Sequence, residues 1–231
     1  MVECDINILC ISDYFKMVEG DRMIVLYSGT PGSGKSLHAS RDIQTRINFK
    51  KMTIGNFPIA KETDYYIFND RDLNVNWLIN FSKEYFKTHQ YHEGEIRVYI
   101  DEAQLLFNCR DFTRHDRDLW ISFFTQHRHL GYDIYFMCQF DRMLDRQIRS
   151  LIEYEYIHKK VNNFGLKGWI ISLLFLAPSR LFVCTQIWKP LNERIGAEYF
   201  RYSKKLGKLY DTNRLFDNLR DDFKEGKEEK E

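Results

Sequence analysis

Neither sign of charge dominates this sequence, because 34 lysine and arginine residues face 33 aspartate and glutamate residues and the formal net charge is +1. A chain that coats nucleic acid or a membrane through its overall charge is therefore excluded, and any basic surface must be local. Long hydrophobic runs are missing as well. The longest, Trp169 to Ala177, contains Ser172 and falls short of the roughly 20 apolar residues of a spanning helix. We predict no transmembrane segment.

The cysteines are few and scattered. There are five, an odd number, and no two of them form a C-x-x-C pair, which argues against a disulfide framework and against a zinc ribbon. They are Cys4, Cys10, Cys109, Cys138 and Cys184. A reducing compartment fits best, and we expect a cytoplasmic protein. The N-terminus carries acids and no basic region before its short apolar stretch, so a signal peptide is not expected either.

The composition supplies ample material for a core, with 44% hydrophobic and 16% aromatic residues in 231. At roughly 150 residues per domain, this length allows one large α/β domain or two small ones. Short β-branched or aromatic runs alternate with longer helical patterns. This alternation predicts βαβ units and a three-layer α/β fold with a mainly parallel sheet.

The same patterns place the elements along the chain. Two apolar runs, Trp169–Leu176 and Leu181–Trp188, flank a segment in which Pro178 suits a turn, so we predict a C-terminal β-hairpin there. The other expected strands are 23–28, 52–56, 97–101, 133–139 and 153–160, and the expected helices are 35–49, 73–88, 114–130 and 142–152.

The two ends differ from the rest. Residues 1–22 carry little apolar patterning before the strand-like run at Met23, so they are either a genuine N-terminal extension or the product of a start site placed too far upstream. Residues 213–231 are densely charged and predict a solvated, flexible tail. The folded domain is expected to span residues 23–212.

The strongest motif is GTPGSGKS, which satisfies G-x-x-x-x-G-K-[ST], the Walker A pattern. A strand-like run precedes it and a helical pattern follows, as required of a loop whose backbone N–H groups cradle phosphate oxygens. Lys35 is expected to reach the β- and γ-phosphates of ATP, and the Ser36 hydroxyl to ligate Mg²⁺. The predicted nucleotide-binding residues are Gly29, Thr30, Pro31, Gly32, Ser33, Gly34, Lys35, Ser36 and Leu37.

A second strand-like run, RVYI, leads directly into Asp101 and Glu102. In a P-loop fold the acid at this position holds Mg²⁺, which is the Walker B role, so Asp101 is the second predicted metal ligand. A further acid directly after it is the usual general base that activates water against the γ-phosphate. Glu102 therefore predicts hydrolysis in preference to transfer of phosphate to a substrate.

Two strand ends carry further polar candidates. The strand Tyr132 to Cys138 leads into Gln139, which fits the sensor position beside the γ-phosphate or the attacking water; ordinary polarity at a strand end is the alternative. Asn56, at the end of an earlier strand, either initiates a turn or hydrogen-bonds Glu102.

The segment QHRH at 126–129 ends a predicted helix. Cations at a helix C-terminus are favoured whatever their function, yet Arg128 is also our first candidate for an arginine finger that enters a neighbouring subunit's site. A stripe at helical spacing follows, which suits a subunit interface, a nucleic-acid-facing surface or a solvated helix face: Arg142, Arg146 and Arg149.

With these features in hand, the chain resembles the zonular occludens toxin-like (Zot) family, which includes the assembly ATPases of filamentous bacteriophages. The resemblance extends from about Met23 to Thr212. The phosphate-site motifs are common to all P-loop ATPases, whereas QHRH and the segment YSKKLGKLYDT at 202–212 are more specific.

The resemblance implies a P-loop ATPase fold of the additional-strand type, related to hexameric DNA motors. It implies a homo-oligomeric ring on the cytoplasmic side of the host inner membrane that exports phage single-stranded DNA and works with the coating protein of that DNA and a membrane-embedded partner. Residues that match the family are Lys35 and Ser36 in the loop, Asp101 and Glu102 as the hydrolysis pair, Gln139 as the sensor and Arg128 as a family-typical arginine.

Phage-assembly members typically continue into a transmembrane helix and an outer domain, whereas this sequence ends in its charged tail. Membrane attachment would then come from a separate partner or from the 169–188 hairpin, or be lacking. A different class of function is also open: a nucleotide-dependent switch or scaffold that binds DNA or proteins with little turnover. Glu102 counts against a switch, a small-molecule kinase lacks a visible acceptor-binding motif, and nothing in these residues supports a toxin.

Overall fold

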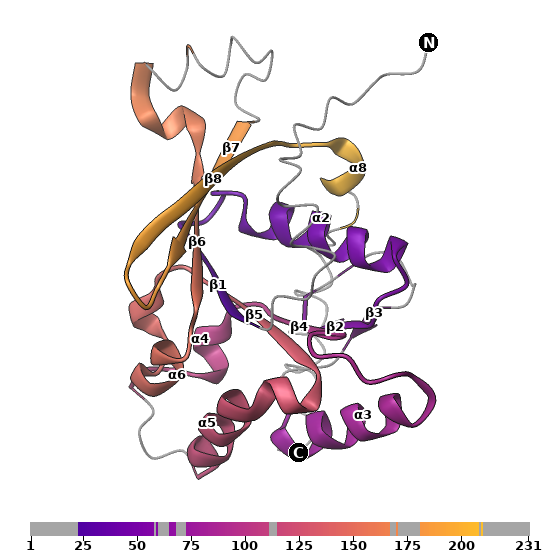
Figure 1. Ribbon diagram of the computed structural model, residues 1–231. Helices are drawn as coiled ribbons and strands as arrows, with labels where there is room; N and C mark the ends of the chain where they lie inside the picture. Colours follow the sequence, from indigo (N-terminus) through magenta and orange to yellow (C-terminus); the bar gives the residue numbers. More distant parts are fainter. Residues whose placement is uncertain are drawn as a thin grey trace, which may run out of the picture.

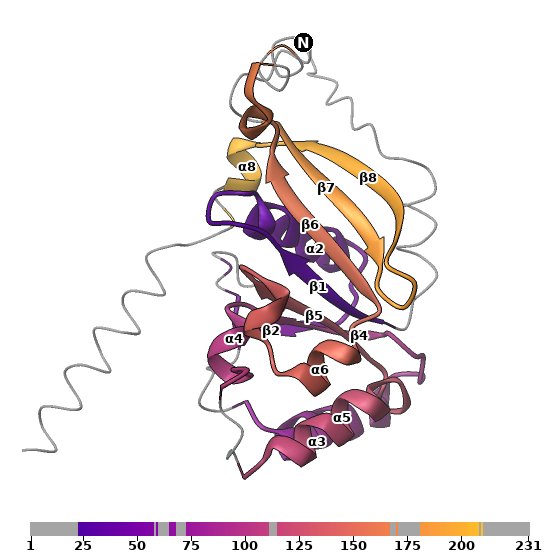
Figure 2. The same cartoon turned by 90° about the vertical axis from the view of Figure 1, so that its left-hand side faces the viewer.

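Eight strands form one sheet in the part of the chain that the computed structural model describes, namely residues 23–57, 59, 65–67, 73–110, 115–166, 170, 181–207 and 209. The strands are β1 (Ile24–Ser28), β2 (Thr53–Gly55), β3 (Tyr65–Ile67), β4 (Ile96–Ile100), β5 (Tyr132–Cys138), β6 (Tyr154–Lys160), β7 (Leu181–Trp188) and β8 (Glu193–Arg201). Their order is β3-β2-β4-β5-β1-β6-β7-β8. The pairs from β3 to β6 are parallel, and β7 and β8 continue the sheet antiparallel (Figure 2).

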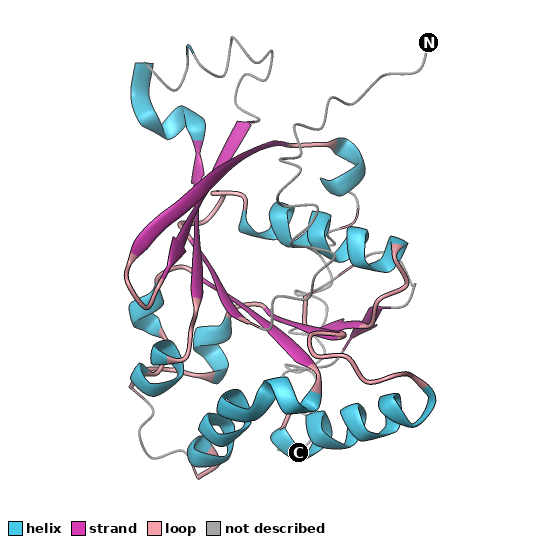
Figure 3. Ribbon diagram, in the orientation of Figure 1, coloured by secondary structure: helices cyan, strands magenta, loops and turns pink. Residues whose placement is uncertain are grey.

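Helices cover both faces of the sheet (Figures 1 and 3). One face carries α2 (Lys35–Asn48) and the short α8 (Lys204–Gly207); the other carries α3 (Val75–Thr88), α4 (Ala103–Leu106), α5 (Arg117–Gln126) and α6 (Arg146–Ser150). Within the described ranges, three 3₁₀ turns connect the elements: η1 (His127–Leu130), η2 (Asp141–Met143) and η3 (Val161–Phe164). The predicted three-layer α/β fold with a mainly parallel sheet is confirmed.

The central strands are apolar along their whole length because both of their faces are covered. Every residue of β1 and of β5 is buried. Side chains alternate between the two faces, so Ile24 and Leu26 join the cluster under α3 and α5, whereas Val25 and Tyr27 pack with Ile43 of α2. Burial of each large apolar side chain contributes about 1.5–3 kcal/mol to folding.

The strand order identifies the additional-strand variant of the fold. β5 lies between β1, which leads into the glycine-rich loop, and β4, which leads into Asp101. The three strands are parallel, so their C-termini lie together at one end of the sheet, here called the carboxyl end, and their N-termini at the amino end. Ligands of open α/β sheets bind at the carboxyl end.

The predicted strand Leu181–Trp188 is present as β7, but its predicted hairpin partner, Trp169–Leu176, is wrong. β7 pairs with β6 on one side and with β8 on the other, so both of its edges are taken. The hairpin is instead β7–β8, closed by a turn in which Asn192 N donates to Lys189 O at 3.1 Å. Of the predicted first strand, Ile170 is helical and the rest lies outside the described residues. The sequence of β8, ERIGAEYFR, contains several charged residues and a glycine, so its pattern does not predict a strand. Pairing with β7 stabilises it as a strand.

Two predicted helices are shorter than expected. The helix expected at 114–130 is α5, which tightens into η1 before Gly131. The helix expected at 142–152 is interrupted, because the Asp145 carboxylate caps α6 by accepting from the backbone N–H groups of Gln147 at 2.8 Å and Ile148 at 3.3 Å. Arg142 therefore lies in η2, outside the helix of Arg146 and Arg149, and the predicted arginine stripe is not continuous.

Within the described ranges, no helix has the length and apolar character needed to cross a bilayer. The predicted extension 1–22 and the predicted tail 213–231 both lie outside those ranges.

Candidate nucleotide-binding site

The glycine-rich loop joins the carboxyl end of β1 to the N-terminus of α2. At two of its positions a side chain would clash with neighbouring atoms and would also strain the backbone, so glycine is required. Gly29 has a φ of +143°, and a Cβ there would lie 2.5 Å from the carbonyl oxygen of His158. Gly34 has a φ of +100°, and a Cβ there would lie 2.8 Å from the Phe182 ring. The loop is therefore pressed against β6 and β7, which only glycine permits.

The loop presents groups that suit a phosphate. Ser33 N donates to Thr30 O at 3.1 Å and closes the turn. The Ser33 hydroxyl is buried and has no hydrogen-bond partner among the described residues, which is costly unless a ligand supplies one. The first turn of α2 contains Lys35 and Ser36 and no acidic residue, so its positive end is not neutralised. These residues fit the phosphates of a nucleotide.

The Lys35 ammonium folds over this loop. Its Nζ donates to Gly29 O at 2.6 Å and to Thr30 O at 3.4 Å. Burial lowers the pKa of Lys35, while the charges of Glu102 and Asp101 act to raise it. The two acids at the end of β4 therefore influence the lysine at the end of β1, across the inserted strand β5.

Asn56 holds Asp101 in place through its backbone. The Asn56 side chain accepts from Asp101 N at 2.7 Å and donates to Asp101 O at 3.1 Å, and Asn56 N donates to Tyr99 O at 3.3 Å. This clamp joins the end of β2 to the end of β4. Asn56 therefore has a positioning contact with Asp101, beyond the two roles that the sequence suggested.

Glu102 has the strained backbone that is common at functional sites. Its φ is +47° in the left-handed region, which costs a residue with a side chain on the order of 1–3 kcal/mol. Its N–H donates to Asp101 Oδ1 at 2.9 Å, and its exposed carboxylate accepts a hydrogen bond from the amide of Gln104. The carboxylate is thereby oriented from α4, while it remains open to water.

Gln139 lies next to the loop. The backbone carbonyl oxygen of Gln139 accepts a hydrogen bond from Gly29 N at 3.1 Å, which joins the end of β5 to the end of β1. Gln139 also lines a cavity of about 580 Å³ together with Ser28, Gly29 and Thr30. The cavity thus reaches the start of the loop, while Lys35, Asp101 and Glu102 are not among the residues that line it.

Sequence reasoning missed a network of hydrogen bonds and ion pairs beside this cavity. Glu155 of β6 accepts from the Ser28 hydroxyl at 2.6 Å and from Lys189 Nζ at 2.7 Å, and Lys189 also approaches Asp141 at 3.4 Å. Burial acts to lower the pKa of Lys189, but the two carboxylates raise it overall. This network connects the β7–β8 turn to the end of β1. Its residues are far apart in the sequence and come together only in the fold, so no local motif marks them.

Arg128 lies away from the other candidates. It belongs to η1, which precedes β5, whereas Gln139 follows β5; a strand of that length spans about 20 Å. Its guanidinium pairs with Glu153 of the same chain, and its carbonyl accepts from the Tyr91 hydroxyl at 2.8 Å. Arg128 thus lies at the amino end of the sheet and does not join the site of its own chain.

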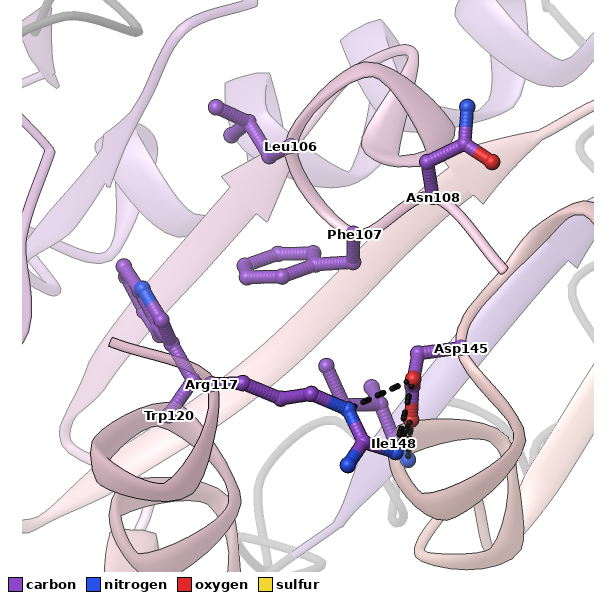
Figure 4. A pocket seen from close by; sticks show the side chains of 7 residues that line it. All are labelled: Leu106, Phe107, Asn108, Arg117, Trp120, Asp145 and Ile148. Carbon is purple, nitrogen blue, oxygen red and sulfur yellow. Dashed lines mark hydrogen bonds and ion pairs between the residues drawn. The ribbon is translucent and has the colours of Figure 1, made fainter. Parts of the chain in front are cut away.

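A second, small cavity of about 20 Å³ lies among α4, α5 and α6 (Figure 4). Arg117 crosses it, and its Nε donates to Asp145 Oδ2 at 3.0 Å. The volume suffices for about one water molecule and not for a nucleotide. This ion pair joins α5 to the cap of α6, which is a structural role.

The family is decided by a sequence comparison. The family model described as zonular occludens toxin (Zot) matches residues 23–214 of this chain. The chain belongs to the Zot family. The match covers the loop, both acids, the QHRH segment and most of the described structure. No curated relative matches this Zot-family chain by sequence.

Solved structures confirm the P-loop NTPase fold. The N-terminal domain of zonular occludens toxin from Neisseria meningitidis is 19% identical, with a TM-score of 0.53, and the match covers 82% of this chain and 98% of that one. The genome packaging NTPase B204 from Sulfolobus turreted icosahedral virus 2, in complex with ATP-gammaS, is 15% identical, with a TM-score of 0.50 and coverages of 79% and 98%. A DnaB-like replicative helicase is 10% identical, with a TM-score of 0.57 and coverages of 80% and 56%.

Proposed function

We propose that this Zot-family chain is an ATP-hydrolysing motor that drives assembly of a filamentous phage and exports its single-stranded DNA. The observation that carries the proposal is the strand order, which puts Lys35, Asp101 and Glu102 at the carboxyl end of the sheet, with Gln139 at the end of the strand between them. This is the arrangement that hydrolysis of a γ-phosphate needs.

Each residue of the site has a role in this proposal. The loop from Gly29 to Leu37 binds the phosphates of ATP, and Lys35 neutralises the β- and γ-phosphates. Ser36 and Asp101 would hold Mg²⁺, whose positive charge offsets the charge that develops on the phosphates when it is bound. Glu102 takes a proton from the attacking water, with its carboxylate oriented by Gln104.

Two further residues are proposed to stabilise the transition state of hydrolysis. Gln139 contacts the γ-phosphate or the attacking water from the end of β5. Arg128 supplies positive charge from a neighbouring subunit, which suits its position at the amino end of the sheet and its exposure. A ring of identical subunits follows from that role, since the site of each chain is incomplete without its neighbour.

The similar folds support a motor that acts on nucleic acid, since they include a genome packaging NTPase and a replicative helicase. We propose a location on the cytoplasmic side of the host inner membrane, peripheral to it, with a membrane-embedded assembly partner and with the protein that coats the DNA. The ATPase domain in this proposal spans residues 23–212, between an extension at 1–22 and a charged tail at 213–231.

The test is ATP hydrolysis by the full chain, measured with and without single-stranded DNA, alongside its mass by light scattering. We expect DNA to stimulate hydrolysis by a ring-sized species. Lys35→Ala should abolish ATP binding and hydrolysis, whereas the matched control Lys87→Ala, on the exposed surface of α3, should change neither. Hydrolysis that persists in Lys35→Ala would place the site elsewhere, and an inert monomer that still binds ATP would indicate a switch.

A further inference from the structure

Three buried side chains with metal-binding atoms converge behind the glycine-rich loop. They are His38 of α2, His158 of β6 and Cys184 of β7, with exposed fractions of 3%, 1% and 0%. One ligand atom from each lies within 4.8 Å of the others. Cys184 and His158 are directly opposite each other in the β6–β7 register, so they project from the same face of the sheet toward α2.

The distances suit a shared ion. His38 Nδ1 and His158 Nε2 lie 2.8 Å apart. Two imidazole nitrogens bound to one tetrahedral zinc at about 2.0–2.1 Å would lie roughly 3.3 Å apart, so a small separation of the rings would admit the ion. Nitrogen and sulfur together are the donors that zinc prefers over hard cations such as Mg²⁺.

The outer nitrogens of the two rings each face an oxygen, one within hydrogen-bond distance and one just beyond it. His158 Nδ1 lies 3.3 Å from the backbone oxygen of Ser28, and His38 Nε2 lies 3.8 Å from Glu198 Oε2. A carbonyl or a carboxylate that faces the nitrogen remote from the metal orients a ligating histidine and fixes its tautomer. Both inner nitrogens can then be unprotonated at the same time.

Without an ion, two neutral rings satisfy three of the four nitrogens, because His38 Nδ1 can donate to His158 Nε2 while His158 Nδ1 donates to the Ser28 oxygen. One of the facing nitrogens must carry a proton for the 2.8 Å contact, and the outer nitrogen of that same ring then turns a lone pair toward an oxygen. An extra proton would remove this conflict only by burying a positive charge among the rings of Tyr27 and Phe200, and Glu198 is already paired with Arg41. A metal ion in place of the shared proton lets His38 Nε2 carry a proton that faces the Glu198 carboxylate.

We propose that His38, His158 and Cys184 bind one zinc ion that joins α2 to β6 and β7 directly behind the phosphate loop. Three protein ligands are one fewer than in a closed structural site, so water or another small ligand completes the tetrahedron. The ion would fix the β7–β8 hairpin against the helix that begins at the loop. The proposal is independent of ATP hydrolysis, and its test uses no nucleotide.

The first experiment measures zinc and copper by elemental analysis in the full chain, purified without a histidine tag and freed of loosely bound metal. We expect roughly one zinc per chain. Cys184→Ser and His38→Gln should lose it, whereas Cys138→Ala and His127→Gln, which replace another buried cysteine and histidine, should keep it. Folded protein without zinc, copper in its place, or zinc retained in Cys184→Ser would overturn the proposal.

The second experiment does not depend on whether those variants fold. Co²⁺ is titrated into the metal-free full chain that carries Cys4→Ser, Cys10→Ser and Cys109→Ser, so that Cys138 and Cys184 are the remaining thiols. A thiolate-to-cobalt absorption band that saturates at one equivalent is expected, and Glu198→Gln should weaken cobalt binding by about 10–100-fold. A titration without such a band would overturn the proposal and would show that His38 and His158 are a hydrogen-bonded pair packed among aromatic rings.

Discussion

The carboxyl end and the amino end of the central strands differ in the charges that they bury. At the carboxyl end, Gly29, Gly34 and Glu102 have positive φ angles, and the Ser33 hydroxyl is buried without a partner among the described residues. At the amino end, buried charges face buried charges of opposite sign. Among the described residues, positive φ angles and unpartnered buried atoms occur at the amino end as well, at Lys50, Gly131, Arg97 Nε and His127 Nε2, so what distinguishes the two ends is the paired buried charge.

The amino end is organised by Arg97. Its guanidinium donates to Asp42 of α2 at 3.0 Å and to Asp133 of β5 at 3.2 Å, and the Tyr99 hydroxyl contacts Asp42. Burial acts to lower the pKa of Arg97, but Tyr135 and Asp42 raise it well above its ordinary value. Burial raises the pKa of Asp133 against the opposing effect of Arg97. The paired charges at the amino end join α2 to the sheet, whereas the carboxyl end holds the residues that we propose for chemistry.

The largest effect should come from Arg128, the one candidate catalytic residue at the amino end. Arg128→Ala should keep ATP affinity and lose roughly 10³-fold or more in turnover, the scale of arginine fingers. Mixing it with Glu102→Gln should restore part of the activity, because some interfaces then combine an intact Glu102 with an intact Arg128. Steady-state ATPase assays on the mixed assemblies measure this.

Glu153→Gln is the matched control, since it removes the ion pair and leaves Arg128 in place. It should retain most of the turnover. If mixed assemblies form yet remain as inactive as either variant alone, Arg128 does not act across a subunit boundary, and Arg142 and Arg146 become the next candidates.

A somewhat smaller effect is expected at the carboxyl end. Glu102→Gln should leave ATP binding nearly intact while hydrolysis falls by roughly 10²–10⁴, because the amide keeps the shape of the side chain and loses its basicity. Equilibrium binding and single-turnover rates separate the two effects. The melting temperature should stay the same, since Glu102 is exposed; near-normal turnover would show that the base is another residue.

Arg97→Met should act on stability. It leaves Asp42 and Asp133 buried without their cation, which costs about 3–5 kcal/mol of unfolding free energy. Urea denaturation without nucleotide measures the loss. The triple variant with Asp42→Asn and Asp133→Asn should recover part of it, because the two buried carboxylates that lack the Arg97 cation are then neutral amides. Equal stability of wild type and Arg97→Met would refute the contrast between the two ends.

The smallest effect concerns Asp145, a structural residue near the carboxyl end. Burial acts to raise its pKa, but hydrogen bonds from Arg117, Gln147 N and Ile148 N lower it overall. A lowered folded-state pKa gives stability that is present above the unfolded value of about 3.9 and is lost as the pH falls through the folded value.

Asp145→Ala should therefore lose about 1 kcal/mol near neutral pH through the missing cap, whereas Asp145→Asn should keep the cap. The difference in melting temperature between wild type and Asp145→Ala should shrink as the pH falls below about 4. A difference that stays constant down to strongly acid pH would mean that the carboxylate charge contributes nothing.

The sequence by itself determined the features that rest on local pattern. GTPGSGKS between a strand and a helix, RVYI before Asp101, and the buried run of β5 each predict an element from neighbouring residues, and the sheet has all three. Backbone sterics and hydrophobic periodicity act over a few residues, so a short window contains them. The positions of helix ends were less certain, as the cap at Asp145 shows.

Only the tertiary structure decided which distant residues meet. His38 and His158 are 120 positions apart, and neither neighbourhood resembles a metal site. β8 and the Glu155–Lys189 pair likewise depend on β7, whose partners no local pattern specifies. Such contacts form when burial and strand pairing bring whole elements together. The free energy that favours them comes from the entire sheet and not from neighbouring residues. For this reason the residues around the phosphate loop could not be predicted from the sequence of the loop.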